Sequence, residues 1–292
     1  MKSIAFCLSL ALLPAFSAGC ADEGDIEDCV GLNCPNGFQW PYGGELRLWY
    51  VHLPDETEIQ WLIGFFISSQ TPDILPDTEI GYCALNLEAE LNYGYGTNIQ
   101  YIDVGQSITM DLGDHEVNIP KIEPGDEPTV DLAGRPHEGL IYQREISTPT
   151  GEGFFNALHP VTTADDVDFS SDLTPGIYMP PAIEVIQPTG VPITFHGGRD
   201  LTIEWRNVEE PNPDYATVAA IVFIPDAGPQ YQCLVLNNGK MTVPGDFLNL
   251  FEADTGVMVI GTAANAGVLR PDGRWQSMFG MNCHLTPFQR LP

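Results

Sequence analysis

The chain has 292 residues, of which 40 are acidic and 11 basic, so its formal net charge is −29 at pH 7. The few basic residues are scattered and form no stripe, which argues against binding to nucleic acid or to an anionic lipid surface. Hydrophobic residues make up 43% of the chain, enough to build real cores, and this excludes global disorder.

Residues 1–19 have the pattern of a secretory signal peptide. Lys2 precedes an apolar run, and Ser17, Ala18 and Gly19 then lead to Cys20. The run is too short, and its flanks are wrong, for a transmembrane helix. The small residues before Cys20 resemble the lipobox of bacterial lipoproteins, although Leu is usual where Ser17 stands. The resemblance implies that Cys20 is lipidated and that the protein is an exported outer-membrane lipoprotein, held at the membrane by its N-terminal lipid. The alternative is ordinary cleavage and a secreted soluble protein.

Residues 20–42 are expected to form an acidic tether. The segment is rich in Asp and Glu and poor in apolar side chains, a composition that does not support a core. It also holds Cys29 and Cys34, which are close enough in sequence to be candidates for a local disulfide.

Residues 43–179 are expected to form a first β-sandwich module. Leu46, Leu48 and Tyr50 alternate with other residues as in a half-buried strand. The turn residues Asp55, Glu56 and Thr57 follow, and they predict a hairpin between this strand and the next. The expected strands after the first are Glu58–Gln70, Ile80–Leu91, Ile99–Val104, Ser107–Asp111, Glu116–Ile119 and Leu140–Ile146.

Residues 180–292 are expected to form a second β-sandwich module, entered through Pro180 and Pro181. Asn237-Asn238-Gly239 predicts a hairpin because Asn and Gly tolerate positive φ. Residues 245–254 are expected to make one helical turn. The expected strands are Ile183–Ile186, Asp200–Trp205, Thr217–Ile224, Gln232–Leu236, Lys240–Pro244 and Val257–Ala264.

Short strands separated by Gly, Pro and Asn turns indicate an all-β protein with two immunoglobulin-like β-sandwich modules in tandem. Over residues 43–285 the chain resembles uncharacterised bacterial envelope lipoproteins that carry tandem immunoglobulin-like or fibronectin-like modules. The motifs that carry the resemblance are GELRLWY, FFISSQTPD, YIDVGQSITM, DLTIEW and NNGKMTVP. It implies an architecture with Trp205 in a core, and no catalytic or ligand residues.

The cysteines leave their pairing open. Cys7 departs with the signal peptide, and if Cys20 is lipidated, five remain and one is unpaired. Cys233 and Cys283 are disulfide candidates because both fall in the C-terminal module. Cys83 is then left over as a buried thiol, although its pairing with either of them is not excluded.

Two segments are candidate binding sites. Asp165, Asp166, Asp168 and Asp172 could bind Ca²⁺ as a cluster of carboxylates, although the EF-hand pattern fails, and the alternative is a hydrated acidic loop. Tyr93, Tyr95 and Tyr101 could form a platform for a sugar ligand, and the alternative is a hairpin whose tyrosines cap a core.

Motifs for catalysis are missing from the sequence. There is no HExxH, no GxSxG and no phosphate-binding glycine loop. Cys283 and His284 are adjacent in sequence, and adjacent residues on a strand face opposite sides, which is wrong for proton transfer. We expect a non-enzymatic envelope lipoprotein without a cofactor, serving structure, adhesion or assembly through a protein or glycan partner. The alternatives are a carbohydrate-binding or calcium-assisted surface protein and, less favoured, an extracytoplasmic hydrolase.

Overall fold

A computed structural model describes residues 42–68, 82–85, 100–123, 140–146, 154–163, 172–270 and 273–292. Within these ranges almost every element is a β-strand, and the helix is a single turn, α3 (Gly245–Leu248), so the expected all-β class is confirmed. No helix in the described ranges has the length and apolar character needed to cross a membrane. The expected signal peptide and tether, with Cys20, Cys29 and Cys34, lie outside the described residues.

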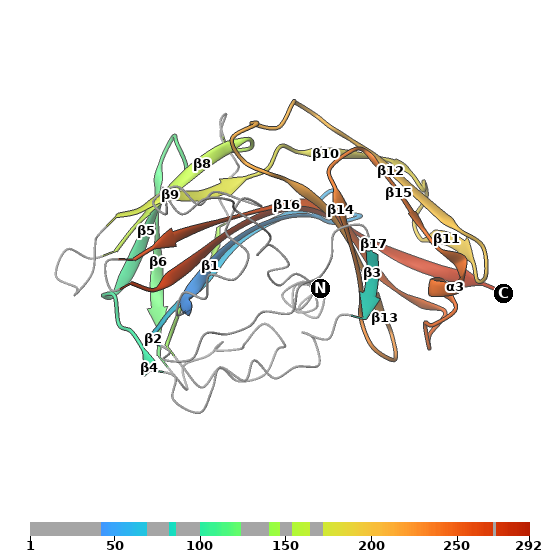
Figure 1. Ribbon diagram of the computed structural model, residues 1–292, viewed down its shortest axis with the longest axis horizontal. Helices are drawn as coiled ribbons and strands as arrows, with labels where there is room; N and C mark the ends of the chain where they lie inside the picture. The colour runs from blue at the N-terminus through green and yellow to red at the C-terminus, as the bar shows by residue number, and fades with distance from the viewer. Residues whose placement is uncertain are drawn as a thin grey trace, which may run out of the picture.

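Two sheets make up the fold (Figure 1). The main sheet runs in the order β3-β14-β13-β16-β17-β1-β2-β7-β6-β5-β8-β9, with β4 added to β2 and β11 added to β17. A second sheet has the order β10-β12-β15. The strand bounds are β1 (Tyr42–His52), β2 (Glu58–Ser68), β3 (Tyr82–Leu85), β4 (Gln100–Tyr101), β5 (Ser107–Asp111), β6 (Glu116–Ile122), β7 (Ile141–Ile146), β8 (Ala157–Thr162), β9 (Asp172–Met179), β10 (Ile183–Gln187), β11 (Ile193–His196), β12 (Leu201–Asn207), β13 (Val218–Pro225), β14 (Tyr231–Leu236), β15 (Lys240–Val243), β16 (Thr255–Leu269) and β17 (Trp275–Leu291).

The C-terminal lobe is a sandwich of immunoglobulin type. The sheet β10-β12-β15 packs over β14, β13, β16 and the end of β17, while β11 runs parallel to β17. Between these two layers lies a hydrophobic core, here named cluster 2, which includes Ile203, Trp205, Ile221, Phe223 and Phe288. Trp205 is buried as expected, and its indole N–H donates to Asn237 Oδ1 at 2.8 Å.

The expected hairpin at residues 237–239 is wrong. Gly239 has a positive φ of 87°, as the turn requires. However, β14 belongs to the main sheet and β15 to the second sheet, so the turn crosses between sheets. The hairpin expected at residues 55–57 is confirmed, because β1 and β2 pair antiparallel across it.

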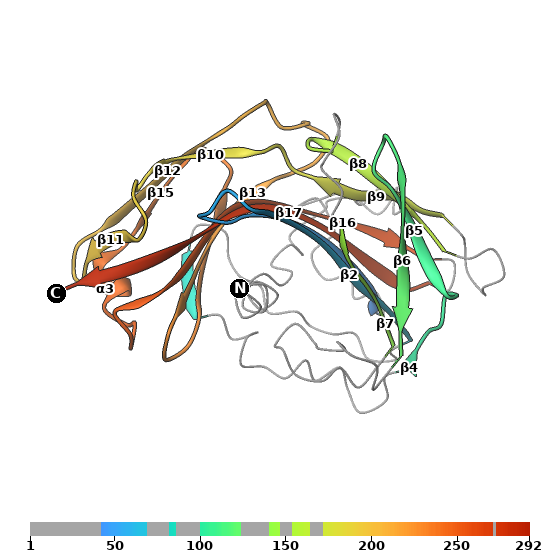
Figure 2. The same cartoon turned by 180° about the vertical axis from the view of Figure 1, so that it is seen from behind.

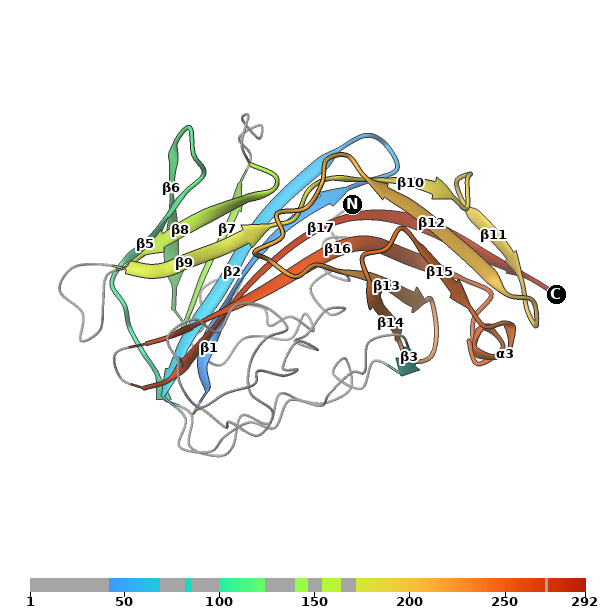
Figure 3. The same cartoon turned by 45° about the horizontal axis from the view of Figure 1, so that its top comes forward.

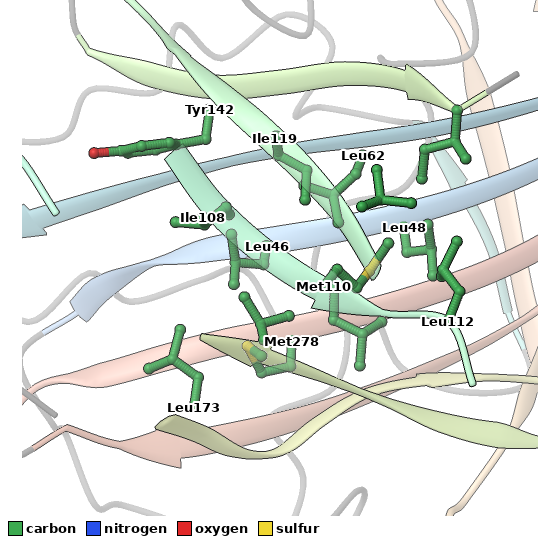
Figure 4. Packing of buried hydrophobic residues seen from close by; sticks show 14 of the residues in the cluster. Leu46, Leu48, Leu62, Ile108, Met110, Leu112, Ile119, Tyr142, Leu173 and Met278 are labelled. Carbon is green, nitrogen blue, oxygen red and sulfur yellow. The ribbon is translucent and has the colours of Figure 1, made fainter. Parts of the chain in front are cut away.

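The N-terminal lobe is a curled part of the main sheet. It wraps around a separate hydrophobic core, here named cluster 1. From β17 the sheet passes through β1, β2, β7, β6, β5 and β8, until β9 packs across β16 and β17 (Figures 2 and 3). Figure 4 shows the aliphatic centre of cluster 1, with side chains from several strands directed inward: Leu46, Leu48, Leu62, Ile108, Met110, Ile119, Leu173 and Met278. Where β9 crosses β17, a Cβ on Gly280 would lie 2.0 Å from the Tyr178 carbonyl oxygen, so this crossing needs glycine.

The hairpin of β16 and β17 serves both lobes. These strands have 15 and 17 residues, and they contribute Ala266 and Met278 to cluster 1 but Met258 and Phe288 to cluster 2. Their other face carries cluster 3, whose members include Trp49, Val259, Met281 and Cys283. The chain passes from cluster 1 at residue 179 to cluster 2 at residue 183, where the module boundary is predicted. The division into 43–179 and 180–292 stays a prediction, to which the structure adds a hairpin common to both cores.

Candidate functional site

Polar side chains interrupt the apolar face of the main sheet where clusters 1 and 2 meet. His52, the last residue of β1, is directly opposite His284 on the parallel strand β17. The two rings stack, with centroids 4.4 Å apart and planes inclined by 10°. Glu58 approaches from β2, with 3.5 Å between its Oε1 and His52 Nδ1, and Asn282 precedes His284 on the same face. We name His52, Glu58, Asn282 and His284 the junction cluster.

Burial keeps both histidine rings of the junction cluster neutral. It lowers the pKa of His52 to about 4, with the neighbouring His284 acting in the same direction and Glu58 opposing. Burial also lowers the pKa of His284, against the hydrogen bond between its Nε2 and the Ile183 carbonyl at 2.9 Å. At pH 7 the two rings therefore stack as uncharged groups.

Asn282 is the polar centre of the junction cluster. Its side chain is fully buried, and neither its Oδ1 nor its Nδ2 has a hydrogen-bond partner among the described residues. The same is true of His52 Nε2, although Asn282 lies close enough to favour the protonated form of His52.

A second polar group joins the two lobes beside the junction cluster. Asn156 Oδ1 accepts hydrogen bonds from the Tyr178 hydroxyl at 2.5 Å and from the Asn212 backbone N–H at 2.9 Å. Tyr215 stacks on Tyr178 with ring centroids 4.4 Å apart. The loop between β12 and β13 is thereby fastened to β8 and β9, which belong to the N-terminal lobe.

The junction cluster lacks the arrangement of a nucleophilic enzyme site. Cys283 lies in cluster 3, on the opposite face of β17 from His284, as the sequence predicts. Its thiol is fully buried, which raises its pKa far above the usual value. Within the described residues, no hydroxyl or thiol is hydrogen-bonded to either ring of the stacked pair, so the geometry offers no nucleophile–base pair.

The disulfide of the described residues joins Cys83 to Cys233, while Cys283 is free and buried. The expected pairing of Cys233 with Cys283 is therefore wrong, as is the expectation of a free thiol at Cys83. Cys233 faces cluster 2 and Cys283 faces cluster 3, and β13 and β16 lie between their strands. Cys83 is instead directly opposite Cys233 in the β3–β14 pair.

The predicted calcium ligands are not brought together by described residues. Asp165, Asp166 and Asp168 lie outside the described ranges, and Asp172 is the first residue of β9, opposite Thr162. The described residues contain no group of three or more His, Cys, Asp or Glu side chains that could hold a metal ion. Calcium binding stays a prediction.

The predicted tyrosine platform is described only at Tyr101. Its half-buried ring packs edge-on against Phe65, with centroids 6.4 Å apart, beside the small apolar cluster of Ile63, Phe65 and Ile141. This is the contact expected when a tyrosine caps a core. Tyr93 and Tyr95 lie outside the described residues, and sugar binding stays a prediction.

Comparison with known proteins gives no family. No protein-family model matches the chain, and neither does any curated protein. Among solved structures, a 1.5-MDa bacterial ice-binding adhesin has a TM-score of 0.21 at 7% identity, covering 85% of this chain and 65% of that chain. The FN1–FN3 domains of chicken CNTN1 have a TM-score of 0.19 at 15% identity, covering 66% of this chain and 61% of that chain. This chain thus spans less than two thirds of either protein, and scores this low say nothing further about fold or function.

Proposed function

We propose that this protein is an exported, non-enzymatic cell-envelope lipoprotein with a structural, adhesive or assembly role. A lipid at Cys20 anchors it to the outer membrane, and an acidic tether holds a rigid β-sandwich body away from the surface. The observation that carries the proposal is the β16–β17 hairpin, which builds both cores and so makes the two lobes one body. A rigid body suits the presentation of a surface to a protein or glycan partner.

The disulfide supports the exported part of the proposal. Disulfides form and persist in oxidising compartments such as the periplasm and the cell surface, and are rare in the bacterial cytoplasm. Cys83 and Cys233 lie far apart in sequence and are bonded across two paired strands. This agrees with the signal-peptide pattern of residues 1–19.

The geometry of the junction cluster supports the non-enzymatic part. The junction cluster holds two neutral stacked histidines and a buried amide, and no hydroxyl or thiol of the described residues is hydrogen-bonded to either ring. Such an arrangement suits the positioning of two lobes against each other.

Metabolic labelling with a palmitate analogue tests the anchor. The wild-type chain should incorporate label and sediment with outer membranes, while Cys20→Ser should remove both. Cys7→Ser is the matched control because Cys7 lies inside the signal peptide, and it should change neither result. Label that survives Cys20→Ser would contradict lipidation at this residue.

A pull-down tests the role. The whole mature chain, immobilised through its N-terminus, is exposed to solubilised envelope fractions and, in parallel, to a glycan array. Saturable retention of a particular envelope protein supports adhesion or assembly. Retention of glycans alone, weakened by Tyr93→Ala or Tyr95→Ala, would favour the carbohydrate-binding alternative instead.

A further inference from the structure

The first and the last long strands of the fold lie side by side and point the same way. β1 and β17 pair in parallel through ten residue pairs, from Tyr42–Trp275 to His52–His284. The expected tether, residues 20–42, directly precedes the body of β1 in the sequence and so joins the fold at the N-terminal end of this strand. The C-terminal end of β17 lies at the far end of the C-terminal lobe (Figure 1).

This arrangement determines how a pulling force would act on the fold. Tension between the tether and the C-terminal end pulls β1 toward its N-terminus and β17 toward its C-terminus. In a parallel pair these directions are opposite and lie along the strands, so the evenly spaced interstrand hydrogen bonds are sheared together. In a hairpin pulled at its open ends, the bonds break one pair at a time.

The β1–β17 pair is also shielded from water, which would otherwise compete for its hydrogen bonds. β2 and β16 flank it in the sheet, so neither strand is at an edge. Leu46, Leu48 and Met278 cover one face and are fully buried, while Trp49 and Met281 are buried on the other face. Separating the strands would expose apolar surface on both faces simultaneously.

A second parallel pair continues the same line. β11 pairs with the end of β17 from Ile193–Phe288 to His196–Leu291. Apart from β11, the elements between β1 and β17, from β2 to β16, and the Cys83–Cys233 disulfide lie off the direct path of the force while these pairs hold.

We propose that the parallel β1–β17 pair is a mechanical clamp that carries tension between the membrane tether and the C-terminal lobe. The source of the tension rests on the proposed function, since it requires an anchor at Cys20 and a partner held by the folded body. The clamp itself is a property of the fold, and it is measurable on the isolated protein.

Single-molecule force spectroscopy tests the clamp. The mature chain with Cys20→Ser carries handles at its N- and C-termini under non-reducing conditions. In the comparison arm, the N-terminal handle stays and the second handle is attached through a short tag inserted at Gly273, just before β17, where a Cβ would meet nothing within 4 Å. The first arm shears the β1–β17 pair, and the second peels it from its N-terminal end.

We expect the rupture force to be severalfold higher in the shearing arm than in the peeling arm, at equal pulling speed, because forced unfolding reports the barrier to unfolding. Val51→Ala, which trims β1 where it packs in cluster 3, should lower the force in the shearing arm. Equal rupture forces in the two arms, or a shearing arm that unfolds first in the C-terminal lobe, would overturn the proposal. Neither result depends on lipidation, so failure of the clamp is distinguishable from failure of the anchor.

Discussion

At the scale of single residues, the informative positions are polar groups inside an apolar fold. Asn282 is fully buried, and His52 and His284 are half-buried, at the junction of two clusters, and none of the three belongs to a local sequence motif. His52 and His284 lie near opposite ends of the chain, so only the parallel pairing of their strands brings the rings together. The resemblance to immunoglobulin-like modules implied Trp205 in a core, and the alternation of side chains along a strand predicted the opposite facing of Cys283 and His284, but neither predicted the stacked pair.

The stacked pair makes the fold sensitive to acid. The pKa of His52 falls from 6.5 to about 4 on folding, so between these values the unfolded chain binds more protons. The contribution of His52 to stability is complete above pH 6.5 and is lost as the pH falls toward 4, by up to about 3 kcal/mol. Urea unfolding at a series of pH values measures it.

His52→Phe is the informative variant, since it keeps a ring against His284 and removes one titrating group. It should flatten the loss of stability between pH 6.5 and 4. His115→Phe is the control because His115 lies in a partly exposed turn beside Asp114. An NMR titration that places the pKa of His52 near 6.5 would contradict the expectation.

Gly280 is a second residue on which the lobes depend. A methyl group at this position would collide with the Tyr178 carbonyl oxygen, which is backbone and cannot turn aside. Gly280→Ala should lower the free energy of unfolding by about 2 kcal/mol, in the range of other overpacked sites. Gly197→Ala is a suitable control because the nearest atom to its Cβ would be the end of the Asn249 side chain, at 3.0 Å, and its other neighbours, Arg290 Cδ at 3.7 Å and the Leu291 carbonyl oxygen at 3.9 Å, lie at ordinary contact distances. A melting temperature unchanged by Gly280→Ala would argue against tight packing of β9 on β17.

At the scale of elements, strands with clear alternation or continuous apolar character were predictable. The sequence predicts Ser107–Asp111 as β5 has it, and it predicts β2 to within two residues. β17, the longest strand, was not predicted. Gln276, Asn282 and His284 break its apolar pattern, because they pack against polar groups of distant strands that no local window contains.

The disulfide acts on one element, β3, which it fastens to β14. Because Cys83 and Cys233 are separated by 150 residues, the bond removes much of the conformational freedom of the unfolded chain. Chain-entropy arguments give about 5 kcal/mol for a loop of this length, an upper limit for real proteins. In a Cys29→Ser/Cys34→Ser variant, reduction of the Cys83–Cys233 disulfide should therefore lower the urea concentration at the midpoint of unfolding.

The double substitution Cys83→Ala/Cys233→Ala in the same background should make stability independent of reductant. Its midpoint of unfolding in urea should match that of the reduced parent, apart from the small effect of replacing two cysteine side chains by alanine. A parent midpoint that does not respond to reductant, with loss of the bond verified by thiol titration, would show that the bond adds no stability.

At the scale of the whole molecule, the shared hairpin predicts one unfolding transition. Independent tandem modules would unfold separately, but β16 and β17 belong to both cores, so opening either core disrupts the other. Native-state hydrogen exchange should give the same opening free energy for the amides of Leu62, in cluster 1, and Ile203, in cluster 2. Two well-separated values would mean that the lobes are energetically independent.

The predicted organisation into two sandwich modules overlooked this sharing for a physical reason. Strand patterns report which side of a strand is buried, not which lobe supplies the covering residues. Pro180 and Pro181 do mark the point where the chain leaves cluster 1, but the return of the chain through Ala266 and Met278 leaves no comparable signal.

The pairing of β1 with β17 also governs the order in which the protein can be made. Trp49 pairs with Met281, which is made roughly 230 residues later. Until then, β1 has no partner strand on the side opposite β2. A chain emerging from its N-terminus therefore exposes the apolar residues of β1 on that edge until β17 has been made. Such a delay favours slow folding and a need for chaperones in the compartment where the chain emerges. The contact that joins β1 to its second neighbour therefore forms only after all the strands from β2 to β16 have been made.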